Sequence, residues 1–171
     1  MKTITRHHAI EMYRQLGVMA LGHLDEVTLS ATLDNFDKFR NIQEDLQKLA
    51  QELSKRLYEG KDEKAKEEFF KLIAILESEN DAEKRAEIES QMKQYAEFFE
   101  LYAKQLKVMT QLLFKKVEAD ITEVDKDAFI AGVVKGKKDA KVHEIVAFFA
   151  PMFKEEEKKD SDFSELDELL K

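Results

Sequence analysis

The sequence predicts an all-α protein, a helical bundle with two long antiparallel helices and several shorter ones. Only five Gly and one Pro occur in 171 residues, so few positions interrupt a helix. Apolar residues make up 43% of the chain, enough for a sizeable core. In residues 28–58 and 81–117 apolar side chains recur at steps of three and four, a period that places them on one side of a helix.

A short helix is expected before the first long one. Ile10, Tyr13 and Leu16 form one apolar stripe that Met19 can extend, while the β-branched residues within 2–5 leave an extended alternative open. Gly60 follows the last turn of the first long helix, where a left-handed residue ends many helices. The apolar side of this helix holds Leu29, Leu33, Phe36, Phe39, Ile42, Leu46, Leu49, Leu53 and Leu57.

A third helix near 62–80 leads into the second long helix. Asn80 followed by Glu83 resembles a capping box, which predicts that the second long helix begins there. We expect the bundle to bury its two apolar rows, and dimerisation through a residual part of the seam is the alternative. The heptad seam is Ile88, Met92, Tyr95, Phe99, Tyr102, Leu106, Met109 and Leu113, and the second row is Phe98, Leu101, Val108 and Leu112.

Residues 1–153 are predicted to form a single helical bundle domain. Two short helices are expected near 128–136 and 142–150, and Pro151 stops the second of them. Residues 154–171 are predicted to be an acidic, partly flexible C-terminal tail, because they hold eight acids and four lysines.

Composition restricts the partners and the compartment. A net charge of −8 argues against direct nucleic-acid binding, since neutralising phosphates requires a cationic face. No cysteine is present, and no stretch is apolar enough to cross a bilayer or to act as a secretory signal. We therefore expect a cytoplasmic protein that does not bind membranes and has no cofactor.

Few residues are candidates for catalysis or metal binding. His7, His8 and Glu11 lie within about one turn, and His23 or His143 can complete a metal site. HExxH and the Glu-x-x-His pairs of di-iron bundles are missing, so no metal site is expected. The usual phosphate loops and G-x-S-x-G are missing too. We expect no enzyme, with a metal-dependent enzyme as the third hypothesis.

Two charged segments are candidates for binding a partner. The stretch "GVVKGKK" and its surroundings hold a basic patch that suits a phosphate or an acidic partner, or else is a solvated turn. The stretch "DFSELDELL" resembles acidic amphipathic helices that enter apolar grooves, or else docks on its own bundle. The basic residues are Lys135, Lys137, Lys138 and Lys141, and the apolar residues of the tail are Phe163, Leu166, Leu169 and Leu170.

Three segments resemble small uncharacterised helical proteins of bacteriophages and prophages. They are "AIEMYRQL", "FDKFRNIQEDLQKLAQELSKRLYE" and "VHEIVAFFAPMFKEEE". The resemblance implies an accessory protein of a phage or mobile element, and it implies no activity or site residue.

The function that we predict is non-enzymatic. Abundant amphipathic surface favours a scaffold, adaptor or inhibitor that works through protein contacts. The alternative is an acidic decoy that mimics nucleic acid and competes with it for a DNA- or RNA-binding protein. Such a decoy requires carboxylates along one continuous face.

Overall fold

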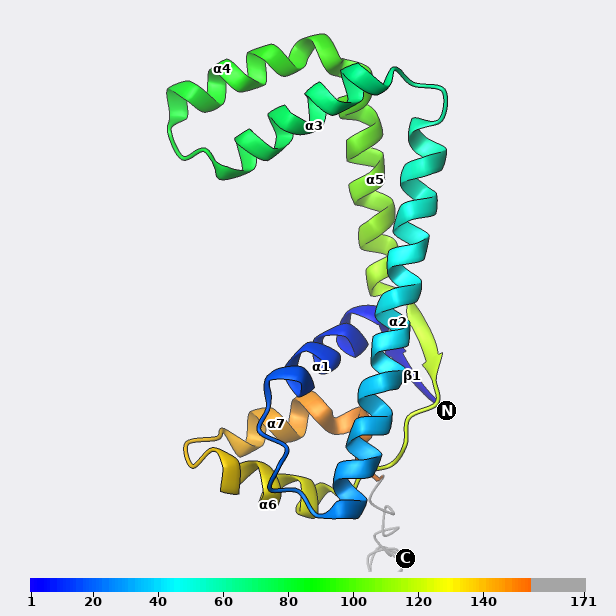
Figure 1. Cartoon of the computed structure of the whole chain (residues 1–171), viewed down its shortest axis with the longest axis vertical. Helices are drawn as coiled ribbons and strands as arrows, with labels where there is room; N and C mark the ends of the chain where they lie inside the picture. The colour runs from blue at the N-terminus through cyan, green and yellow to red at the C-terminus, as the bar shows by residue number, and fades with distance from the viewer. Residues whose placement is uncertain (155–171) are drawn as a thin grey trace, which may run out of the picture. The chain divides into compact units, whose positions relative to one another are not determined.

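The computed structural model describes residues 1–154, and their regular structure is mostly helical (Figure 1). The helices are α1 (Arg6–Val18), α2 (Glu26–Tyr58), α3 (Glu63–Ser78), α4 (Ala82–Met92), α5 (Ala96–Phe114), α6 (Lys126–Gly136) and α7 (Val142–Phe149), with 3-10 turns η1 (Lys93–Tyr95) and η2 (Ala150–Met152). Two short strands, β1 (Lys2–Thr5) and β2 (Lys116–Ala119), pair with each other. The predicted all-α class is confirmed. In residues 1–154, no helix is both long enough and apolar enough to cross a bilayer.

The chain falls into two compact units. Unit 1 consists of residues 1–2 and 12–38 together with the chain from Ala119 onward, and unit 2 consists of residues 3–11 and 39–118. Helices α1 and α2 contribute residues to both units. The single domain predicted from the sequence therefore stays a prediction.

Helix α2 begins at a carboxylate cap and ends before a left-handed glycine. The Asp25 carboxylate accepts hydrogen bonds from the amide (3.0 Å) and the hydroxyl (2.6 Å) of Thr28. Both bonds lower the pKa of Asp25, and the bond from the hydroxyl has the larger effect. Tyr58 is the last helical residue, and Gly60 has a φ of +73°. The first predicted long helix is confirmed.

The second predicted long helix is helical from Ala82 to Phe114 with one break. Its cap is Asp81 rather than Asn80, because the Asp81 carboxylate accepts from the amides of Glu83 (2.9 Å) and Lys84 (3.1 Å). Turn η1 then separates α4 from α5, and the two helices leave it in different directions (Figure 1). Helix α5 runs antiparallel to the part of α2 that belongs to unit 2.

The break changes which side of α5 is buried. A 3-10 helix turns by about 120° per residue against about 100° in an α-helix, so three residues advance the side chains by about 60°. Before the break, Ile88 and Met92 of the seam are buried. After it, Phe98 is 7% exposed, whereas the seam residue Phe99 is 52% exposed. Within α5 the seam is therefore divided, because Tyr102 packs against the core cluster as predicted, whereas Phe99 and Leu106 are about half exposed.

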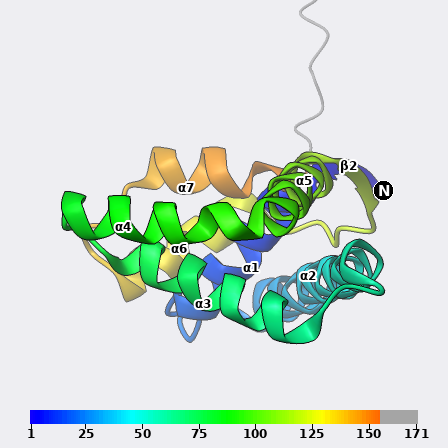
Figure 2. The same cartoon turned by 90° about the horizontal axis from the view of Figure 1, so that it is seen from above.

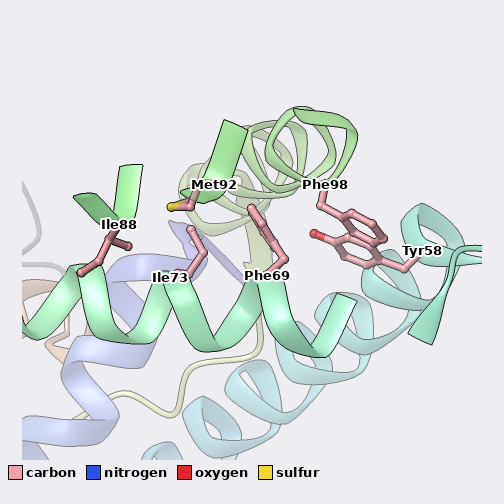
Figure 3. Packing of buried hydrophobic residues seen from close by; sticks show 6 residues of the cluster. All are labelled: Tyr58, Phe69, Ile73, Ile88, Met92 and Phe98. Carbon is pink, nitrogen blue, oxygen red and sulfur yellow. The ribbon is translucent and has the colours of Figure 1, made fainter. Parts of the chain in front are cut away.

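Aromatic side chains from three helices form the core of unit 2 (Figure 3). Phe69 of α3 is fully buried, and its ring centroid lies 6.0 Å from that of Phe98 on α5. Tyr58 of α2 lies nearly parallel to the Phe98 ring, with centroids 6.3 Å apart, and donates its hydroxyl to Gln105 Oε1 (3.0 Å). Burial raises the pKa of Tyr58. Ile88 completes the cluster where α3 and α4 lie side by side (Figure 2).

The N-terminal residues of unit 2 form hydrogen bonds with the end of α5 and with β2. Residues 2–5 adopt the extended alternative and form strand β1. Thr3 of this strand donates its hydroxyl to the Glu118 carboxylate of β2 (2.7 Å). Arg6 donates Nη1–H to the Leu112 carbonyl (3.0 Å) and its backbone amide to the Lys115 carbonyl (3.2 Å). The cation therefore lies at the C-terminal end of α5, where the carbonyls lack helical partners.

A buried asparagine joins α2 to the segment before α6 in unit 1. Asn35 is fully buried, donates its amide to the Thr122 carbonyl (2.7 Å) and accepts from the Thr122 amide (2.8 Å). Lys38 donates to the Thr122 hydroxyl (2.8 Å) and pairs with Asp34 (2.8 Å). Their mutual hydrogen bond raises the pKa of Lys38 and lowers that of Asp34.

Helices α6 and α7 form a hairpin with an aromatic core. Phe129 of α6 is fully buried, and its ring centroid lies 5.5 Å from that of Phe149 and 5.6 Å from that of Phe153. Pro151 lies in η2, directly after α7, as its missing amide hydrogen predicts.

The core of unit 2 can be tested with two isoleucines of α3. Ile73 is 9% exposed within the cluster, so we expect Ile73→Ala to lower the free energy of unfolding by about 2–4 kcal/mol. Ile75 is 49% exposed, and Ile75→Ala should change it by less than about 1 kcal/mol. Both variants gain the same helix propensity, and equal losses in urea denaturation would contradict this packing.

The asparagine contact of unit 1 can be tested in the same way. Asn35→Ala leaves the amide and carbonyl of Thr122 without their partner, so we expect a loss of about 2–3 kcal/mol. Asn35→Asp keeps the acceptor alone and should also destabilise. Asn41→Ala, at an exposed position of α2, should leave the urea midpoint nearly unchanged. A similar midpoint for Asn35→Ala and Asn41→Ala would refute the stabilising role of this contact.

Candidate functional site

The end of α1, the residues after it, α6 and α7, all within unit 1, line an open cavity of about 760 Å³. Its volume lies in the range of cavities that hold ligands in proteins. We call it the unit 1 groove. Its apolar lining is formed by Val18, Met19, Val133, Ile145, Phe148 and Phe149.

The apolar lining is fixed on one side and open on the other. Phe149 is 2% exposed, and its ring meets Phe148 edge-on with centroids 4.9 Å apart. Phe148 and Ile145 are half-buried, and Val18, the last residue of α1, is 80% exposed. The groove therefore offers apolar surface to a ligand without movement of the core.

The predicted basic patch lies at this groove. Lys137 and Lys141 belong to its lining, while Lys135 and Lys138 lie on the same exposed stretch outside the lining. Two carboxylates also line the groove, and that of Glu144 pairs with Lys141 (3.1 Å). The second is Asp139. Within the lining the two lysines balance the two carboxylates, whereas the whole stretch 135–144 holds four lysines and two carboxylates and so has an excess of two positive charges in a chain of net charge −8.

Two glycines allow α6 to approach the connection between α1 and α2. A Cβ at Gly132 would lie 2.4 Å from Leu24 Cδ2 and 3.0 Å from the His23 carbonyl oxygen. A Cβ at Gly136 would lie 3.2 Å from the carbonyl oxygen of Ala20, which lines the groove. The glycines of "GVVKGKK" therefore serve close helix packing at one end of the groove.

The predicted metal candidates are not brought together as a ligand set. The His7 ring packs against Phe114, with centroids 5.1 Å apart. In the stretch 1–154, no group of three or more His, Asp or Glu is arranged to hold a metal ion, and this covers His7, His8 and Glu11.

The carboxylates along α2 give the decoy hypothesis no support. Four of them pair with cations one turn away: Asp34 with Lys38, Glu44 with Arg40, Asp45 with Lys48, and Glu52 with Arg56. Interleaved cations interrupt the row of negative charge that a nucleic-acid mimic needs.

The tail residues Phe163, Leu166, Leu169 and Leu170 lie outside the described residues. The sequence also failed to single out Val18, Met19, Ile145 and Phe148 as a site. One signal was present, because "VHEIVAFF" holds more apolar side chains than one face of an eight-residue helix can bury. Met19 can extend the apolar stripe of Ile10, Tyr13 and Leu16, but that pattern predicts a helix and not a site, and Val18 gave no signal.

The close packing at the groove can be tested with helical glycines. Alanine in place of glycine normally stabilises a helix by up to about 1 kcal/mol. At Gly132 the new methyl group meets Leu24 and backbone atoms, so we expect Gly132→Ala to lower stability by about 1–3 kcal/mol. Gly17 of α1 has room, with Phe36 at 3.6 Å, and Gly17→Ala should raise the thermal midpoint. A higher midpoint for Gly132→Ala would contradict the close approach.

Comparison of the chain with protein-family models, with curated proteins and with solved structures finds no significant match.

Proposed function

We propose that this chain is a non-enzymatic protein-interaction module, a scaffold, adaptor or inhibitor acting in the cytoplasm, whose unit 1 groove binds an acidic amphipathic helix of a partner. In line with the resemblance above, we place it among the accessory proteins of a phage or mobile element. The observation that carries the proposal is the open apolar lining of the groove beside an excess of lysines.

An amphipathic helix fits the apolar part of the groove. Such a helix inserts side chains at i, i+3, i+4 and i+7 into a concave apolar surface. The exposed Val18 and the half-buried Ile145 and Phe148, which all line the groove, provide that surface. Burying these side chains against a partner removes apolar surface from water and so stabilises the complex.

An acidic helix fits the charged rim. Lys137 is exposed and lines the groove, and Lys135 and Lys138 add positive charge next to it. Carboxylates on the outer face of a bound helix would meet these lysines. Such attraction raises association rates and disfavours basic partners.

The chain itself contains a sequence with the chemistry of the proposed ligand. In residues 158–171, Phe163, Leu166, Leu169 and Leu170 share one side of a helical pattern in which five acids also occur. A synthetic peptide of residues 158–171 is therefore a suitable probe for the groove.

The proposal is tested by titrating the labelled peptide with the full-length chain and following fluorescence anisotropy. We expect Val18→Glu to weaken binding at least tenfold, because it removes apolar contact and repels the acidic peptide. Val27→Glu is the matched control, since Val27 is 79% exposed and Val18 80%, and Val27 does not line the groove. A peptide in which Ser replaces Leu166 and Leu169 should bind neither the unchanged chain nor its variants.

Two outcomes would contradict the proposal. One is equal binding by the Val18→Glu and Val27→Glu variants. The other is that neither the full-length chain nor a chain ending at Lys154 binds the peptide. Stronger binding by the shorter chain would show that residues 155–171 compete for the groove. Affinity purification with both Val variants then identifies the partner as the protein lost from the Val18→Glu bait alone.

A further inference from the structure

We propose that helix α5 forms an antiparallel two-fold interface with α5 of a second copy of this chain. The inference concerns unit 2 and does not depend on the unit 1 groove. The side of α5 turned away from the core carries a half-exposed apolar row, which we call the α5 stripe, and the ring of one of its members, Phe114, contacts that of His7. It consists of Phe99, Ala103, Leu106, Thr110 and Phe114.

The α5 stripe is continuous along the helix. Its members lie at i, i+4, i+7, i+11 and i+15, which keeps them within about 80° of the helix circumference. Phe99 is 52% exposed, Leu106 51% and Phe114 55%. Large apolar side chains exposed singly are ordinary, whereas a row spanning four turns of one helix is typical of an interaction surface.

The polar member of the stripe is already satisfied within the helix. Thr110 donates its hydroxyl to the Leu106 carbonyl (2.9 Å). Its methyl group is therefore free to contact a partner, and no unsatisfied donor would be buried with it.

One flank of the stripe carries a pair of opposite charges. Glu100 and Lys107 are both exposed and lie seven residues apart, so their side chains project in directions about 20° apart. The other flank holds the half-buried Tyr102 and Met109. The row of charges therefore runs from negative to positive along α5.

This arrangement is self-complementary when two copies pair antiparallel. If Phe99 lies beside Leu106 of the second copy, Glu100 comes within about 3 Å, along the helix axis, of Lys107 of that copy. Two-fold symmetry forms the same pair a second time. In a parallel pair the charged flank would instead face Tyr102 and Met109, and both charges would stay without a partner.

The expected interface is small. In this register Phe114 lies opposite position 91 of the second copy, before α5 of that copy begins, so the contact rests on Phe99, Leu106 and their symmetry mates. These side chains, each about half exposed, bury less area than the roughly 1,200 Å² that marks the lower end of stable interfaces. We therefore expect a reversible dimer that forms at micromolar concentrations.

The first test is the mass of the full-length chain in sedimentation velocity over a hundredfold range of concentration. We expect a shift from monomer to dimer, and Leu106→Glu should abolish it. Ile75→Glu is the matched control, because Ile75 is 49% exposed and lies on α3. A monomer at every concentration, or a dimer that Leu106→Glu leaves unchanged, would overturn the proposal.

The second test separates the antiparallel pairing from other arrangements. Glu100→Lys and Lys107→Glu alone each place like charges opposite one another, so each should weaken the dimer severalfold at low salt. The double variant restores opposite charges and should recover the affinity of the unchanged chain. All these positions are exposed, so circular dichroism should show unchanged folding. No recovery in the double variant would refute the antiparallel register.

The third test uses the absence of cysteine from the chain. The register places Ala103 next to the two-fold axis, where Ala103 of the second copy also lies. Mild oxidation of the Ala103→Cys variant should therefore yield a disulfide-linked dimer within the concentration range of the reversible one. Ala86→Cys, at an exposed position of α4, is the control, and equal cross-linking of both variants would contradict the interface.

Discussion

The 3-10 turn Lys93–Tyr95 determines how unit 2 buries its apolar surface. It lets α4 lie beside α3, while α5 continues antiparallel to α2. The same turn rotates α5 so that Phe98 enters the aromatic cluster and Phe99 leaves it. One local change of helical winding therefore produces both the core of the unit and the half-exposed stripe that we assign to a second copy.

Unit 1 follows a different physical rule, because its helices are short and its packing depends on small and polar residues. Gly132 allows the backbone of α6 to approach Leu24, and Asn35 supplies both partners that the Thr122 backbone needs. Phe149 is buried and Phe148 is half-buried, and both line the groove. Helices of this length cannot cover every apolar residue, and the remainder forms the groove surface.

The helices themselves were predictable from the sequence for a simple reason. Helix-forming composition, apolar residues at steps of three and four, and the left-handed Gly60 depend on local interactions, which a linear pattern records. The cap at Asp81 rather than Asn80 was missed by one residue, since both side chains can accept the same hydrogen bonds.

Of the candidate site, the lysines near Gly136 were visible in the sequence because they form a contiguous run. The apolar surface beside them was not, because Val18 and Phe148 are 130 residues apart and meet at one groove only after folding. Likewise, a heptad count cannot register a rotation of about 60° at a 3-10 turn, since the sequence around Lys93 shows no proline or glycine to mark it.

The sequence by itself determined that this chain is helical, where most of its helices begin and end, and which apolar side chains share one side of each helix. Only the tertiary structure decided which of those apolar side chains are buried and which stay exposed. The physical reason is that helix formation depends on neighbours within about four residues, whereas burial depends on what the rest of the chain brings to each face.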